Sequence, residues 1–427
     1  MSEAAFAAPH GRDAISVLRD AATIRRRCGA ITQAVSEGRS SNFKLDRNRL
    51  DEVAARVERV TRTTYPDLRI PFHSRWRHFE SGGIDRKVEM DEAMAGRTME
   101  DQARARIDLT VVSVLLDAGA GPNWRYLEAD SGQTFTRSEG LGVASWHAFQ
   151  QGLFSDTAGD RLRADAAALQ RLDVSALRSS FQVSSDNPLV GLEGRVALLN
   201  RLGAALAADQ GMEGRPGALF DRLTRQITGA SATQEAGHHV TAAQVLRAVL
   251  DGFSSIWLTG SMLQGVPLGD VWPHRWAGGE SKSHGGHGTT DDWVPFHKLS
   301  QWLSYSLLEP LMWAGVKVSG LDALTGLPEY RNGGLLIDGG VIVARDPRLL
   351  EKRWKVSDEF IIEWRALTVS LIDELAPLVR ARLGKAAEDM PLACILEGGT
   401  WAAGREIARE LRNGSPPLSI DSDGTVF

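Results

Sequence analysis

Apolar residues recur every three or four positions along most of the chain, which is the period of amphipathic helices. This pattern predicts a helix over residues 15–35, a second one after the capping residue Asp46, and a third over residues 102–118 that stops at Gly119. Further helices are expected over residues 162–177, 196–207, 242–257, 296–314 and 357–383. The sequence therefore predicts a mainly α protein with a multi-helix globular fold.

Strand signals are confined to short stretches. Residues 335–337 and 341–343 are apolar and flank Asp338-Gly339, an arrangement that predicts a short hairpin. For the domain organisation we expect a division near residue 155. It would separate an N-terminal helical region over residues 1–155 from a second region over residues 156–427, which carries the helix around residues 298–309 and the acidic turn after it.

The composition is that of a folded protein able to bury a large core. Of its 427 residues, 43% are hydrophobic and 24% are charged, and the net charge of −5 predicts no nucleic-acid partner. Cys28 and Cys394 lie far apart and form no CxxC motif, which favours a reducing compartment. Because neither a signal peptide nor a long apolar run is found, we expect a cytoplasmic protein with no membrane partner.

Residues 70–80 carry the densest set of chemically active side chains, including His73, Arg75, Arg77 and His78. Two nearby prolines disfavour a helix, so we expect extended chain or a loop, and in the extended form His73, Arg75 and Arg77 would point to one side. Guanidinium groups supply paired donors that suit a phosphate or a carboxylate. The alternative is a structural arginine network that ties the loop to neighbouring carboxylates.

Aromatic and ionic side chains follow the third predicted helix. Trp124 could stack on a base-like or ureido group, or else cover an edge of the core. Arg137 and Glu139 add ionic groups to the same region.

The helix predicted over residues 296–314 has an unusual polar face. Its side chains at Lys298, Gln301, Trp302, Tyr305 and Glu309 fall within an arc of about 100°, and leucines form the opposite face. Large aromatic groups among polar ones predict either a pocket wall or a buried interface. The proline that follows Glu309 is expected to kink or end the helix.

A glycine-rich segment over residues 324–338 contains Glu329, Tyr330, Arg331 and Asp338. The two carboxylates are expected on turns, where either could act as a general base or stabilise a cation. The alternative is turn chemistry together with a salt bridge to Arg331.

Six of the ten histidines lie between residues 238 and 297, which raises the question of a metal site. Asp270 and His274 are a candidate pair of ligands, and His297 lies nearby in the sequence. The spacing matches no HExxH or HxH motif, so no metal is predicted. Because dinucleotide, P-loop and nucleophile-elbow motifs are also missing from the sequence, we expect no cofactor.

Four stretches of the chain resemble the signature stretches of a uracil-catabolism protein family that was formerly catalogued as a domain of unknown function. They are HSRWRHF at residues 73–79, NPLVGLEGR at 187–195, PFHKLSQWL at 295–303 and LTGLPEYRNGG at 324–334. The similarity spans roughly residues 14–380. It implies a place in a pathway that converts uracil to a nucleotide, opens the pyrimidine ring and then splits a ribosylurea-type product.

The order of elements is also similar to that of the queuosine-salvage proteins, which are N-glycoside hydrolases. This second resemblance implies a DNA-glycosylase-like helical core with a few short strands. That family carries a catalytic aspartate on the helix matching residues 298–311, where this chain has Ser304. A shared chemistry therefore requires another carboxylate, and the candidates are Glu309, Glu329 and Asp338.

Together these features predict an N-ribosyl hydrolase acting on ribosylurea, its 5-phosphate or a related breakdown product. Glu329 or Asp338, with Glu309 in reserve, would stabilise the cationic sugar, and His297 or Lys298 would assist the leaving group. The substrate-binding group would be completed by His73, Arg75, Arg77, His78, Trp124, Arg137, Glu139, Asp270, His274, Gln301, Trp302, Tyr305, Tyr330 and Arg331. The alternatives are a metal-assisted amidohydrolase and a non-catalytic nucleotide-binding protein. The expected partner is a small nucleotide-like molecule.

Overall fold

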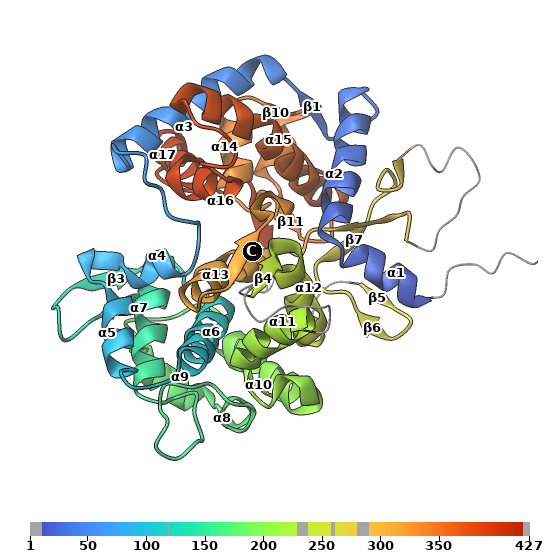
Figure 1. Cartoon of the computed structure of the whole chain (residues 1–427). Helices are drawn as coiled ribbons and strands as arrows, with labels where there is room; N and C mark the ends of the chain where they lie inside the picture. The colour runs from blue at the N-terminus through green and yellow to red at the C-terminus, as the bar shows by residue number, and fades with distance from the viewer. Residues whose placement is uncertain (1–10, 118, 229–237, 258–260, 280–289, 422–427) are drawn as a thin grey trace, which may run out of the picture. The chain divides into compact units, whose positions relative to one another are not determined.

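The structure is a computed structural model that describes residues 11–117, 119–228, 238–257, 261–279 and 290–421. Helices dominate it, and its strands form small two-stranded sheets (Figure 1). The predicted mainly α fold class is therefore confirmed.

The described chain forms two compact units, and each is assembled from separate stretches. Unit 1 comprises Met1–Leu68, Trp257–Lys298 and Thr325–Asp421. Among the described residues, unit 2 comprises those of the stretches Arg69–Ile256 and Leu299–Leu324. The division expected near residue 155 lies inside unit 2, and as a domain boundary it stays a prediction.

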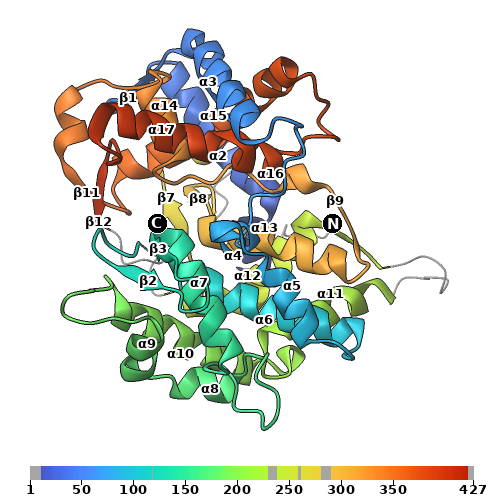
Figure 2. The same ribbon diagram turned by 90° about the vertical axis from the view of Figure 1, so that its left-hand side faces the viewer.

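Unit 1 is built around α15 (Glu359–Leu383), which packs against α2 (Ala21–Ser36) and α3 (Leu50–Thr64). Figure 2 shows these helices from a second side. Residues 360–369 of α15 are buried on every side, as expected of a helix at the centre of a core. The other described α-helices of unit 1 are α1 (Gly11–Leu18), α14 (Asn332–Asp338), α16 (Leu392–Ile395) and α17 (Trp401–Arg412).

The single helix predicted over residues 15–35 is wrong, because the chain breaks between α1 and α2. The carboxylate of Asp20 accepts a hydrogen bond from the backbone N–H of Ala22 at 2.9 Å, and so caps α2. An aspartate that binds the backbone in this way favours a helix start over a helix interior. Asp46 caps a short 3₁₀ turn, Arg47–Arg49, which leads into α3 as expected.

The predicted hairpin around Asp338 is also wrong. Residues 332–338 form α14, so Asp338 ends a helix, and β10 (Ile342–Ala344) pairs antiparallel with β1 (Phe43–Leu45). A short apolar run fits a helix or a strand equally well, and the partner strand is remote in sequence. The other strand pairs of unit 1 are β5 (Met262–Leu263) with β6 (Val266–Pro267), β7 (Val271–Pro273) with β8 (Trp293–Pro295), and β11 (Arg353–Lys355) with β12 (Ser419–Asp421).

Unit 2 is organised by α6 (Met99–Leu115), which packs against α7 (Arg137–Gln150) and α11 (Leu219–Thr228). The third predicted helix thus ends before Gly119, at Leu115. The other described α-helices of unit 2 are α4 (Trp76–Phe79), α5 (Arg86–Ala93), α8 (Ala166–Arg171), α9 (Val174–Ser180), α10 (Leu192–Ala208) and α12 (Ala242–Phe253). Its strands pair as β2 (Arg125–Leu127) with β3 (Thr134–Thr136) and β4 (His239–Thr241) with β9 (Lys317–Ser319).

Helix α13 (Lys298–Trp313) starts at the last residue of a unit 1 stretch and continues in unit 2. The helix does not end at Pro310, which is buried, but continues as far as Trp313, and the expected kink stays a prediction. The helix predicted over residues 162–177 is instead the pair α8 and α9, since Asp165 and Asp173 each cap a new helix start.

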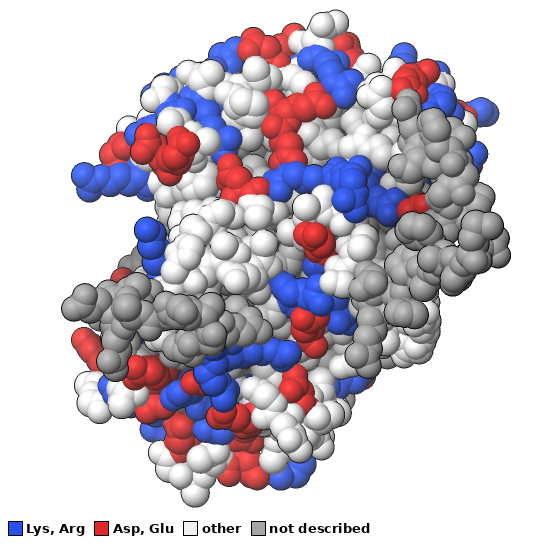
Figure 3. Space-filling model, turned by 45° about the vertical axis from the view of Figure 1, so that its right-hand side comes forward, with Lys and Arg blue, Asp and Glu red and all other residues white. Residues whose placement is uncertain are grey.

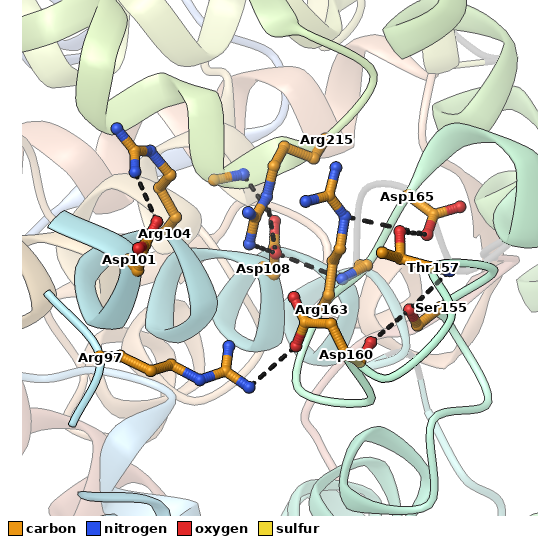
Figure 4. A network of polar contacts seen from close by, with 12 residues as sticks. Arg97, Asp101, Arg104, Asp108, Ser155, Thr157, Asp160, Arg163, Asp165 and Arg215 are labelled. Carbon is orange, nitrogen blue, oxygen red and sulfur yellow. Dashed lines mark hydrogen bonds and ion pairs between the residues drawn. The ribbon is translucent and has the colours of Figure 1, made fainter. Parts of the chain in front are cut away.

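A buried polar network fixes α6 within unit 2 (Figure 4). The carboxylate of Asp108 is fully buried, pairs with Arg215, and accepts backbone N–H bonds from Gly217 at 2.6 Å and Ala164 at 3.2 Å. Burial raises the pKa of Asp108, and Arg215 opposes that shift. The network ties two connecting segments to the same turn of α6.

On the face drawn in Figure 3, basic and acidic side chains are intermixed. An example of such pairing is Arg275, whose Nε lies 2.6 Å from a carboxylate oxygen of Glu359. In the part of the chain that the structure describes, none of the helices has both the length and the apolar character needed to cross a membrane.

Candidate functional site

The segment around residues 73–79 is a loop as far as Arg75, as the sequence allowed, but it then forms a short helix that was not expected. Residues 76–79 form α4, and Ser74 accepts a hydrogen bond at its Oγ from the backbone N–H of Trp76 at 3.2 Å. The two prolines lie before this short helix and do not interrupt it. Consequently His73, Arg75 and Arg77 do not share one side of a strand.

Glu309 of α13 meets this segment inside unit 2. One carboxylate oxygen of Glu309 accepts a hydrogen bond from Ser74 Oγ at 2.7 Å, and the other accepts one from Arg77 Nη2 at 2.7 Å. Arg77 also contacts Glu80, at 2.8 Å. The side chains of Arg77 and Glu309 are 16% and 15% exposed. Ser74 and Arg77 thus bring the segment before and within α4 into direct contact with the carboxylate of Glu309 on α13.

Trp302, two turns before Glu309 on α13, lies between two histidines. Its ring centroid is 4.6 Å from that of His73 and 6.1 Å from that of His78. Gln301 and Tyr305 are fully buried, so the face of α13 predicted to be polar lies in the interior. We call the set His73, Ser74, Arg75, Arg77, His78, Trp302 and Glu309 the loop–helix site.

Arg75 is a fully buried member of the loop–helix site. Its Nε donates to Ser113 Oγ at 2.7 Å, and its Nη1 lies 2.9 Å from Asp117 and 3.1 Å from the carbonyl oxygen of Ser138. Burial lowers the pKa of Arg75, and Asp117 opposes this effect. These contacts match the structural arginine network that the sequence left as an alternative.

The remaining predicted residues of unit 2 lie at different depths. Trp124 is fully buried, and its Nε1 donates to the carbonyl oxygen of Phe181 at 3.0 Å, as a core aromatic would. Arg137 is exposed, with φ of 55° at the start of α7. Glu139 is half-buried in the first turn of the same helix.

In unit 1, Asp270 organises the chain just before α13. Its carboxylate forms two hydrogen bonds with Arg365, at 2.7 and 2.6 Å, and accepts the backbone N–H of Lys298 at 2.9 Å. Burial would raise the pKa of Asp270, but Arg365 and these hydrogen bonds outweigh it and hold the pKa below its ordinary value. Asp270 therefore positions the start of α13.

His297, directly before α13, has a left-handed backbone with φ of 48°. Its Nε2 lies 2.8 Å from the carbonyl oxygen of Leu18, so that nitrogen carries the proton. Burial lowers the pKa of His297, which favours the neutral ring.

Asp270 and His274, the candidate pair of ligands in the sequence, each contact other protein groups, and Asp270 binds Arg365. His274 instead accepts the backbone N–H of Trp276 at its Nδ1, at 3.3 Å. Among the described residues no group of three or more His, Cys, Asp or Glu side chains is placed to hold a metal ion. Two of the clustered histidines, His284 and His287, lie outside the described residues.

Glu329 and Asp338 belong to unit 1 and already bind protein donors there. Glu329 accepts the backbone N–H groups of Arg331 and Asn332 at 2.8 and 2.7 Å, so it caps α14. Asp338 pairs with Arg412. Burial raises the pKa of both carboxyls.

The contacts of Glu329 include the turn chemistry that the sequence offered as an alternative, and the charge of Arg331 also acts on this carboxyl. Arg331 contacts Glu329 through its backbone, and its guanidinium lies 4.9 Å from the ring centroid of Tyr330. Tyr330 is 37% exposed.

Sequence reasoning missed Ser74 of the loop–helix site and also Ser113 and Asp117, which bind Arg75. A serine gives little signal, because its role depends on which side chain faces it. Asp117 does give one: an acidic residue just after a helix C-terminus is unfavourable for the helix dipole and requires a cation nearby. Arg75 is that cation.

The loop–helix site combines a carboxylate, a broad aromatic ring, two imidazoles and a buried guanidinium within one unit. A carboxylate can stabilise a cationic centre, and an aromatic ring can support the apolar face of a sugar. The site therefore suits a small polar molecule that develops positive charge.

Comparison of the sequence with known proteins shows which family this helical protein belongs to. The chain belongs to the family described as "Protein of unknown function (DUF1688)", whose model matches residues 17–427. It is 39% identical over 422 residues to "Uracil catabolism protein 4" of Lachancea kluyveri, covering 92% of this chain and 93% of that protein. It is 36% identical over 412 residues to "Protein urg3" of Schizosaccharomyces pombe, covering 95% and 96%. The family resemblance noted in the sequence is confirmed.

Proposed function

We propose that this protein acts in uracil catabolism as a hydrolase of the N-ribosidic bond of ribosylurea, its 5-phosphate or a related breakdown product. The near full-length similarity to a protein named for uracil catabolism supports the pathway. The proposal also retains a DNA-glycosylase-like helical core, on the order of elements shared with the queuosine-salvage proteins.

The observation that carries the reaction is the position of Glu309. Cleavage of a ribosidic C–N bond builds positive charge on the sugar, and glycoside hydrolases stabilise it with a carboxylate. Ser74 and Arg77 hold the Glu309 carboxylate in one orientation beside the histidine–tryptophan cluster. We therefore assign Glu309 the role of stabilising the sugar cation or orienting the attacking water.

The other members of the loop–helix site take supporting roles in this proposal. Trp302 would contact the sugar, and His73 would contribute to binding a 5-phosphate, which supplies binding energy remote from the scissile bond. Arg77 keeps its role of holding Glu309, because both of its terminal nitrogens already contact carboxylates. Arg75 is withdrawn from phosphate binding because its side chain is fully buried. Glu329 and Asp338 become the reserve carboxylates, since each already serves as a cap or an ion-pair partner in unit 1.

A second candidate, a non-catalytic nucleotide-binding protein, is favoured by one specific observation. All three candidate carboxylates accept hydrogen bonds or ion pairs from the protein itself. Carboxylates bound in this way can serve the protein's own structure, and a binding protein requires no more of them than that.

The test is incubation of the purified protein with ribosylurea and with its 5-phosphate, with free urea measured by mass spectrometry. We expect urea release, and we expect Glu309→Gln to lower kcat by about 100-fold or more. The matched control is Glu80→Gln, because Glu80 binds the same guanidinium of Arg77 from the exposed side. It should stay within a few-fold of wild type. Tight binding with no urea would support the binding protein, and full activity of Glu309→Gln would contradict the assignment.

A further inference from the structure

The contact between Arg75 and His78 determines the protonation of the histidine ring. Arg75 Nη1 lies 3.3 Å from His78 Nδ1. A guanidinium can only donate hydrogen bonds and keeps its proton in proteins, so Nδ1 must offer a lone pair. His78 is therefore the neutral tautomer that carries its proton on Nε2.

Several contacts keep Arg75 in the position that fixes this tautomer. Asp117 pairs with the same Nη1, Ser113 accepts from Nε, and the backbone N–H of Arg75 donates to Ser306 Oγ at 2.9 Å. The guanidinium cannot rotate away from His78 without breaking these bonds. Glu139 is the other acidic group that acts on Arg75.

His78 also packs closely against the neighbouring helix α7. Helix α4 packs against α7, where Gly142 leaves room for it. A Cβ added at Gly142 would lie 2.7 Å from the Cβ of His78, well inside van der Waals contact. The ring also meets the edge of Trp302. The imidazole is thus placed from its backbone, its Nδ1 side and its aromatic neighbour.

We propose that Asp117 and Arg75 act as positioning residues that maintain His78 as a neutral Nε2–H donor to the carbonyl oxygen of a ureido leaving group. The identity of this acceptor rests on the proposed function. When the ribosidic C–N bond breaks, its electron pair passes to the ureido nitrogen and is delocalised onto the carbonyl oxygen. A neutral imidazole can stabilise that oxygen by donating a hydrogen bond without losing its proton.

The proton balance of this step involves water and leaves His78 unchanged. The attacking water adds its hydroxyl group to the sugar carbon, and its remaining proton ends on the urea nitrogen. The products are the free sugar, or its phosphate, and neutral urea.

The tautomer is testable without any substrate, by NMR of protein labelled with ¹⁵N-histidine and assigned with His78→Gln. We expect His78 to show an unprotonated Nδ1 and a protonated Nε2 at neutral pH. Arg75→Met should give a mixture of tautomers and a ring that takes up a proton at higher pH. Asp117→Asn, which keeps the arginine but loosens it, should shift the ring the same way by less. Lys87→Met, which removes a cation from the neighbouring α5, should leave the signals unchanged.

The donor role has its own kinetic readout. His78→Phe should lower kcat by about 100-fold with KM within a few-fold, and His78→Gln, which keeps a donor, should recover part of that loss. A protonated Nδ1 in the wild type, or His78 signals unmoved by both Arg75→Met and Asp117→Asn, would overturn the tautomer assignment whether or not urea is released. Absence of urea with the expected NMR spectrum would instead overturn the proposed reaction and, with it, the ureido acceptor.

Discussion

Glu363 on α15 illustrates how one buried side chain can make stability depend on pH. Its carboxyl accepts hydrogen bonds from Ser40 Oγ and from Asn42 Nδ2, the latter at 3.1 Å. Ser40 Oγ in turn accepts the backbone N–H groups of Asn42 and Phe43, so its own proton points to Glu363. Burial raises the pKa of Glu363 to about 7, because the two hydrogen bonds only partly offset desolvation.

We predict that Glu363→Gln removes a pH dependence of folding. The ordinary pKa is 4.5, so between pH 4.5 and 7 the folded protein holds a proton that the unfolded chain releases. The free energy of unfolding therefore falls as pH rises through this window, by at most about 3 kcal/mol. Urea titrations at pH 5 and pH 8 should show the fall in wild type and a smaller one in Glu363→Gln. Glu52→Gln, at an exposed carboxylate, should keep the wild-type fall, and an unchanged fall in Glu363→Gln would refute the prediction.

Single residues also show where sequence reasoning stops. The sequence identified residues 73–78 and Glu309 as chemical candidates, and the structure brings Ser74 and Arg77 to Glu309. The sequence raised a structural role for Arg75 only as an alternative and could not identify its partners, because Ser113 and Ser138 lie on elements distant in sequence. Burial of a charge is a tertiary property that no local pattern reports.

At the scale of elements, the close approach of α4 and α7 predicts opposite effects for two glycine substitutions. Alanine normally stabilises a helix interior by up to about 1 kcal/mol relative to glycine. Gly194→Ala on α10 should show that gain, since an added Cβ meets nothing within 4 Å. Gly142→Ala should destabilise unit 2, because its Cβ would collide with His78. Urea midpoints of the two variants measure this contrast, and a stabilised Gly142→Ala would contradict the packing.

Helices were predicted well where the helical spacing of apolar residues continues without interruption over many residues, as in α10, α12 and α15. Errors arose where a side chain interrupts the period, as Asp20 and Asp165 do by capping a new helix. The misassigned hairpin has a different cause, since β10 pairs with a strand near the other end of the chain. Local sequence cannot distinguish a strand that turns back from one that finds a remote partner.

At the scale of the whole molecule, we predict that the Asp108 network is essential for unit 2. Asp108→Asn would leave Arg215 buried opposite a neutral group, at a cost of about 3–5 kcal/mol. Hydrogen exchange of α6 amides and urea unfolding should both report this loss. The control is Glu213→Gln, which removes an exposed partner of Arg225 and should change stability by less than about 1 kcal/mol. Similar effects of the two substitutions would contradict the prediction.

The interleaved stretches of the two units have a consequence for how the protein is made. Arg25 of α2 binds Asp373 of α15, 348 residues later in the chain. At about 5–20 residues per second, a ribosome needs tens of seconds to supply that partner. During this time the apolar sides of α2 and α3 emerge uncovered and are open to chaperones or to aggregation. A transcript that ends before the codons of α15 would therefore yield a chain with exposed apolar surface that is prone to aggregation and sensitive to proteases.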